Sequence, residues 1–327
     1  MFGLFGKSKA APPPLREPLK EPLPWRADAT FPIPEWNNVV VPEGAEPGEL
    51  NQFWSTAAFT WLNELRRKLG DRYAIAESEQ FMLLGALPER QRLLALEYAE
   101  KTRSRVLQLL PGIASDEGYG KFVMLVLHDH DAYYEYITNY YTDVPDADEL
   151  AFSSGMYINH GYGHFVFVAE DLDRIEPVIA HELTHSLLAH LPLPAWVNEG
   201  IAVNTERRLC ASSRSGFTAP ELSAKFAEFW NASTIQEFWS GKSWLRPDEG
   251  NSLSYELATT FIGLAAKDDW PSFAAFVNAS DVADAGDSAA RLHLSYPVAH
   301  LAEAVLGPGE WAPAPGRWQD GTERGQF

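Results

Sequence analysis

Apolar residues recur at helical spacing over most of this 327-residue chain. From Glu49 to Gly70, apolar side chains fall three or four positions apart, and the closing glycine is a typical stop signal. The same pattern runs from Glu89 to Gly112, where Pro111 ends it. It predicts further helices at residues 132–141, 175–191, 195–210, 220–230, 253–267, 270–277 and 297–305.

Two short apolar runs depart from this spacing. Residues 121–127 and 165–168 are almost uninterrupted apolar stretches of strand length, and the second leads directly into the helix at 175–191. Continuous apolar strands are typical of sheets that are covered on both faces. We therefore predict the α+β class: a mostly helical domain with a small mixed sheet between helical lobes, and an N-terminal helical layer.

Prolines punctuate the first 47 residues. Proline at this density prevents regular helix and sheet, which predicts an extended arm or linker that could recruit a protein partner. Part of the arm is expected to pack on the body, because its larger apolar side chains are costly to expose: Trp25, Phe31, Ile33 and Trp36.

These patterns divide the chain into four regions. The arm covers residues 1–47, and a helical region follows at 48–118. Residues 119–306 form the main domain, whose helical C-terminal subdomain begins near residue 210. The last region, 307–327, carries proline, glycine and charge and is predicted to be a loose tail.

Composition excludes several classes of protein. The formal net charge of −19 repels phosphate backbones, so no nucleic-acid partner is expected. No stretch approaches the roughly 18 apolar residues of a membrane-spanning helix, which predicts no integral membrane segment. Cys210 is the single cysteine, so no intrachain disulfide can form, and the first residues lack a secretory signal. We expect a cytoplasmic protein.

The residues suited to chemistry gather in one segment, IAHELTHSLLAHLPLPAWVNEGIA, which spans residues 179–202. Each helical residue turns by about 100°, so His181 and His185 project from one face, one turn apart. Their imidazoles can share a zinc ion, and Glu182 sits beside them within reach of a metal-bound water. This is the physical content of the H-E-x-x-H motif.

A catalytic zinc site needs a third protein ligand and an open position for water. His190 is the nearest candidate in sequence, but it lies about 140° round the helix from His185. Glu199 fits better, because Pro192 and Pro194 break the first helix and allow the chain to turn back. Two histidines and one glutamate are the zinc ligands of thermolysin.

HELTH followed by PAWVNEGIA resembles the gluzincin group of zinc metallopeptidases, particularly the compact peptidase MA-like families. In those families a short loop joins an H-E-x-x-H helix to a W-x-x-E-G-x-A helix. The resemblance covers residues 121–267 and implies a zincin-like fold. It implies one Zn²⁺ per chain, held by His181, His185 and Glu199, with Glu182 as the general base.

The resemblance also implies roles for residues outside the motif. The run GHFVFVAED is similar to the edge strand that holds an extended peptide by backbone pairing. Substrate is therefore expected to bind near its start, at Tyr162, His164, Phe165 and Val166. Tyr255 resembles a tyrosine that begins a later helix and donates to the tetrahedral oxyanion. The alternative is a tyrosine that only caps a core helix.

One departure from the thermolysin pattern concerns the outer contacts of the histidines. In that pattern an acidic residue lies four positions after the glutamate ligand, whereas Val203 occupies that position here. Another group must orient the histidines, and Thr184 and Asn198 are expected to point away from the ligands. Gly200 is expected to let the backbone approach the site closely.

These observations predict a zinc-dependent peptidase that acts on peptides or proteins. No G-x-M-E-N-like exopeptidase signature precedes the H-E-x-x-H helix, which favours an endopeptidase over an aminopeptidase. Two alternatives stay open: a catalytically weak or inactive zincin-like binding or regulatory module, and a metal hydrolase that is not a peptidase. The intact Glu182 argues against the first alternative, whereas the proline-rich arm favours it.

Overall fold

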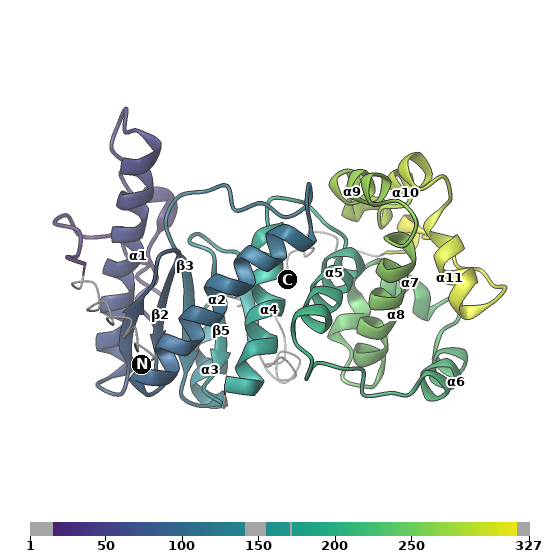
Figure 1. Cartoon of the computed structure of the whole chain (residues 1–327), viewed down its shortest axis with the longest axis horizontal. Helices are drawn as coiled ribbons and strands as arrows, with labels where there is room; N and C mark the ends of the chain where they lie inside the picture. The colour runs from purple at the N-terminus through teal and green to yellow at the C-terminus, as the bar shows by residue number, and fades with distance from the viewer. Residues whose placement is uncertain (1–15, 141–154, 171, 319–327) are drawn as a thin grey trace, which may run out of the picture.

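A five-stranded sheet lies at the centre of the N-terminal half of the computed structural model, which describes residues 16–140, 155–170 and 172–318 (Figure 1). The strands are β1 (Ala74–Glu77), β2 (Phe81–Gly85), β3 (Phe122–Leu127), β4 (Gly155–Ile158) and β5 (His164–Val168). Their order is β1-β2-β3-β5-β4. The three middle strands run parallel, and β1 and β4 pair antiparallel at the two edges. The α+β class and the small mixed sheet are confirmed.

Helices cover both faces of this sheet. Side chains alternate along a strand, so Met124 and Val126 of β3 face one core while Val123 and Leu125 face the other. The first core is completed by α2 (Glu89–Leu109) and α4 (Leu172–Leu188), and the second by α1 (Pro47–Leu69) and α3 (His130–Ile137). This is why β3 is apolar at every position.

The C-terminal half of the chain forms a helical lobe beside α4 (Figure 1). Its helices are α5 (Ala195–Leu209), α6 (Ala219–Phe229), α7 (Thr234–Trp239), α8 (Gly250–Ala265), α9 (Trp270–Ala279), α10 (Asp287–His293) and α11 (Val298–Leu306). Short 3₁₀ helices lie at Trp36–Asn38, Lys242–Leu245, Val282–Asp284 and Pro315–Arg317. Helix α5 lies between α4 and α8 and packs against both. Each helix predicted from apolar spacing corresponds to a helix of the structure, although the ends differ by a few residues. The helix predicted at 132–141 ends at Ile137, residues 138–140 form a turn, and residue 141 lies outside the described residues.

Residues 48–118, predicted as a helical region, contain the helices α1 and α2 and also two strands that were not predicted. This region also supplies β1 and β2, which form one side of the sheet. Strands of four and five residues contain too few positions to show a clear period in the sequence. Their assignment depends on pairing with β3, which lies about 40 residues further along the chain.

The prediction that GHFVFVAED is the edge strand is wrong. Strand β5 is paired on both sides, with β3 and with β4. Among the described strands, β4 is hydrogen-bonded only to β5 and therefore forms the edge next to α4. A four-residue strand beside a glycine-rich turn gave too weak a signal to compete with the longer apolar run of β5.

Both ends of the chain pack more firmly than their composition suggests. In the N-terminal arm, Leu23 and Phe31 are buried against α1 and α3, and Ile33 is also buried, as expected for part of the arm. The C-terminal tail is not loose as far as residue 318, because Trp311 and Trp318 are buried in the helical lobe. The remaining tail, 319–327, and the first 15 residues lie outside the described residues.

Within the described ranges, we find no helix with the length and apolar content needed to cross a membrane.

Candidate metal centre

The segment 179–202 folds into a helical hairpin. Helix α4 ends at Leu188, before Pro192, and α5 begins directly after Pro194. The chain therefore reverses within a few residues and brings α5 back alongside α4. Trp196 anchors the start of α5, since it is fully buried and its Nε1 donates to the carbonyl oxygen of Ala285 at 3.0 Å.

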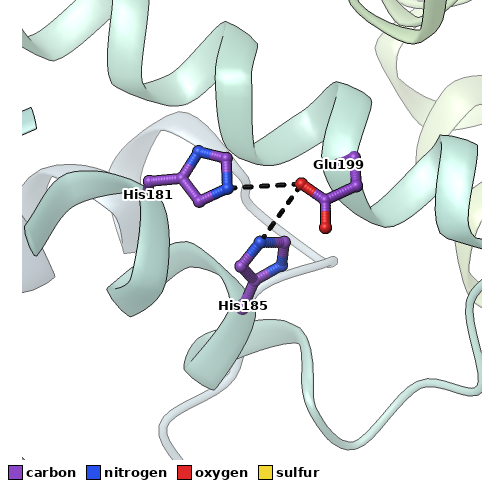
Figure 2. A group of neighbouring side chains, drawn as sticks. All are labelled: His181, His185 and Glu199. Carbon is purple, nitrogen blue, oxygen red and sulfur yellow. Dashed lines mark ion pairs between the residues drawn. The ribbon is translucent and has the colours of Figure 1, made fainter. Parts of the chain in front are cut away.

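This hairpin brings the three predicted ligands together (Figure 2). The Nε2 atoms of His181 and His185 lie 3.2 Å and 3.5 Å from Oε2 of Glu199. The candidate ligand atoms all lie within 4.8 Å of one another. Within residues 16–140, 155–170 and 172–318, these residues form the one group of three or more histidine, cysteine, aspartate or glutamate side chains with this geometry.

A second set of contacts fixes the orientation of each imidazole ring. Nδ1 of His181 lies 3.0 Å from Oε2 of Glu206, and Nδ1 of His185 lies 3.0 Å from Oδ1 of Asn198. Both partners are hydrogen-bond acceptors, so each Nδ1 carries the hydrogen. In a neutral ring, the lone pair then resides on Nε2, which faces Glu199 (Figure 2). Histidines that ligate a metal through one ring nitrogen typically donate a hydrogen bond from the other, as Nδ1 does here.

The residues present fit a bound cation. Oε2 of Glu199 is buried and accepts no hydrogen bond from any described residue, which is costly for a carboxylate oxygen. Two neutral imidazoles would point lone pairs at this oxygen, so acceptor would face acceptor. A positive charge between them removes this conflict. Two nitrogens and one carboxylate oxygen are a ligand set that suits Zn²⁺.

The charges of the site depend on one another when no metal is bound. Burial would lower the pKa of His181, but the adjacent carboxylates of Glu199 and Glu206 hold that pKa well above its usual range. Burial would raise the pKa of Glu199, but the positive charge of His185 and the contact with His181 hold it far below its usual range. Without metal, protons on the imidazoles neutralise this buried carboxylate.

Glu182 lies beside the ligands, as predicted. Its side chain is buried, and burial raises the pKa of its carboxyl group. The backbone N–H of Tyr157, in the edge strand β4, lies close enough to this carboxyl group to lower its pKa against that effect. The candidate base therefore lies close to the edge strand β4.

Tyr255 lies near the start of α8, the helix that packs on α5. Burial raises the pKa of its hydroxyl well above the usual range, and the negative charges of Glu199 and Glu182 raise it further. The hydroxyl therefore remains a hydrogen-bond donor near the metal centre. Its proposed role in stabilising an oxyanion stays a prediction.

The predicted substrate-binding residues are not at the metal centre. His164, Phe165 and Val166 are completely buried, because β5 lies inside the sheet. The hydroxyl of Tyr162 donates to the carbonyl oxygen of Lys121 at 2.7 Å. Their position inside the sheet explains the burial of His164, Phe165 and Val166.

Two residues that orient the histidines were missed or misjudged from the sequence. Asn198 was expected to point away from the ligands but contacts His185. Glu206 lies seven residues after Glu199, which is about 20° from it on a helix, so both project from the same face of α5. Ser213 donates a hydrogen bond to Glu206 and holds it in turn. The seven-residue spacing was the signal that could have identified Glu206.

Gly200 has a different role from the one predicted. A Cβ atom at this position would lie 2.7 Å from the carbonyl oxygen of Ala258 and 2.6 Å from Cγ1 of Ile262. Both residues belong to α8. The glycine therefore allows close packing of α5 on α8, and does not serve an approach of the backbone to the metal centre.

Comparison of the sequence with protein-family models and with curated proteins gives no match.

Proposed function

We propose that this protein is a zinc-dependent peptidase with one Zn²⁺ held by His181, His185 and Glu199. The observation that carries the proposal is the buried Oε2 of Glu199, which has no hydrogen-bond partner and faces two imidazole nitrogens whose rings are held from behind. The resemblance of HELTH and PAWVNEGIA to the gluzincin motifs supports the choice of zinc and of peptide hydrolysis.

The surrounding residues can perform the proton transfers of hydrolysis. A bound Zn²⁺ would polarise a water molecule and lower its pKa towards about 7. Glu182, buried beside the ligands, would take the proton as the water attacks the scissile carbonyl and would pass it to the leaving amine. Tyr255 would donate a hydrogen bond to the oxyanion, because its hydroxyl stays protonated.

We propose that an extended peptide pairs with β4 and not with β5. The support is that β4 is paired on one side only among the described strands, and that the backbone N–H of Tyr157 in β4 lies near enough to Glu182 to lower the pKa of its carboxyl group. A peptide on this edge would lie beside the general base. Pairing through backbone groups does not require a free chain end, which favours an endopeptidase.

Metal analysis and a peptide-library digest test the proposed function. Protein purified without added zinc is expected to contain about one zinc ion per chain, and His185→Ala is expected to lose it. Wild type is expected to cleave peptides, and Glu182→Gln to cleave them about 10²–10⁴-fold more slowly. Cleavage that is unchanged in Glu182→Gln would exclude the mechanism. Bound zinc without cleavage by wild type would support the binding or regulatory module instead.

A further inference from the structure

Helix α5 presents two neighbouring rows of side chains to two different helices. Glu199 and Glu206 face the histidines of α4. The next row, offset by about one residue or 100°, contains Gly200, Asn204 and Arg207 and faces α8. A single rigid helix therefore connects the metal ligands to the helix that carries the candidate oxyanion donor.

The row that faces α8 makes contacts of three kinds. Gly200 brings the two backbones close together at Ala258. Nδ2 of Asn204 donates to the carbonyl oxygens of Gly200 at 2.7 Å and of Thr259 at 2.9 Å. Arg207 forms a two-pronged ion pair with Glu256: Nη2 donates to Oε1 at 2.6 Å, and Nη1 donates to Oε2 at 3.2 Å.

Among these contacts, the ion pair of Arg207 and Glu256 fixes an orientation as well as a distance. Glu256 is buried, so its carboxylate must keep a partner. Two parallel hydrogen bonds fix the angle of a carboxylate as well as its distance, which a single charge contact does not do. Tyr255 precedes Glu256 by one residue. Any rotation of α8 that shifted this carboxylate would therefore swing the Tyr255 hydroxyl by the same angle.

We propose that Arg207 and Glu256 are positioning residues that hold Tyr255 in place at the metal centre. Arg207 adjoins Glu206 in sequence, so neighbouring side chains of α5 orient a zinc ligand and the oxyanion donor. The inference rests on the proposed function, because it assigns Tyr255 a part in turnover.

A double-mutant cycle tests whether Arg207 acts through Tyr255. Arg207→Lys keeps the positive charge but loses the two-pronged geometry. Its kcat is expected to fall by about 10- to 100-fold, with KM and zinc content unchanged. In the Tyr255→Phe variant, adding Arg207→Lys is expected to cause no further fall in kcat, because the hydroxyl that Arg207 positions is already absent. If the reduction in kcat of the double variant equals the product of the reductions in the two single variants, the proposal is overturned.

Arg103→Lys is the matched control. Arg103 has a similar side-chain exposure, 20% against 25% for Arg207, and also pairs with a carboxylate, Asp116, but it lies on α2. Its replacement is expected to leave kcat unchanged. If Arg207→Lys fails to fold, the exchanged pair Arg207→Glu with Glu256→Arg provides the second variant. Recovery of kcat in this variant supports the proposal, and its failure to recover kcat in a folded protein overturns it.

Hydrogen exchange of the zinc-free protein provides a readout that does not need activity. Amides of residues 253–262 are expected to exchange faster in Arg207→Lys than in wild type, while amides of α2 stay unchanged. Equal exchange in both proteins would overturn the proposal. A wild type that cleaves no peptide would overturn the proposed function, and the exchange comparison would still decide whether the ion pair holds α8.

Discussion

Glu206 and Glu199 bind opposite nitrogens of the same imidazole ring. Oε2 of Glu206 lies 3.0 Å from Nδ1 of His181, while Oε2 of Glu199 lies 3.2 Å from its Nε2. Both carboxylates project from one face of α5, two turns apart. The ring of His181, carried by α4, is thus held between two acids of α5, so its orientation depends on how these two helices pack.

Removing the charge of Glu206 should weaken metal binding. In Glu206→Gln, the ring of His181 loses a charge-assisted hydrogen bond and becomes free to turn. We expect zinc affinity to fall by about 10- to 100-fold, as measured by competition with a chromogenic chelator. Glu97→Gln, an exposed change on α2, should leave the affinity unchanged. Equal affinities for wild type and Glu206→Gln would show that Glu206 does not orient the ligand.

Zinc binding should weaken as the pH falls. In the zinc-free protein, contacts with Glu199 raise the pKa of both His181 and His185 above 6.5. A proton on either ring must leave before that nitrogen can bind metal, so protons compete with zinc at and below these raised pKa values. The increase in melting temperature caused by zinc should therefore be larger at pH 8 than at pH 6. A pH-independent increase would contradict this assignment.

Burial of His164 should destabilise the fold in acid. Burial lowers the pKa of His164 to about 4, whereas the unfolded chain has a value near 6.5. Between these values the unfolded state binds a proton that the folded state does not, so stability falls as the pH drops from 6.5 to 4. The loss amounts to roughly 3 kcal/mol for this group.

Urea unfolding at several pH values measures this effect. His164→Gln should be less stable than wild type at pH 7, because Tyr136 loses a well-placed partner, but its stability should depend less on pH in this window. Identical slopes for wild type and His164→Gln would be inconsistent with a neutral buried ring.

Gly200→Ala should destabilise the protein although alanine favours helices. The new methyl group would press on the backbone of Ala258, which cannot move aside without shifting α8. We expect a loss of about 1–3 kcal/mol in thermal unfolding. Gly263→Ala is a matched control on α8, where a Cβ atom would meet no neighbour within 4 Å. That change should instead stabilise by about 0.5–1 kcal/mol.

The helices and the order of the ligands could be predicted because they depend on local spacing. His181 and His185 share a face because they are four residues apart, and this holds in any helix. The prolines at 192 and 194 break that helix wherever it packs. The sequence alone therefore determined where the two ligand-bearing helices lie and which side chains could converge.

The neighbours of each element were decided only by tertiary structure. His164, Phe165 and Val166 read equally well as an edge strand or an interior strand, because side-chain alternation does not reveal which backbone edges are paired. That depended on β4 and β3, which lie elsewhere in the chain. The roles of Glu206 and Asn198 likewise followed from the rotation of α5 against α4. The spacing of residues along the chain determines which side chains share one face of a helix, but tertiary packing determines which residues that face contacts.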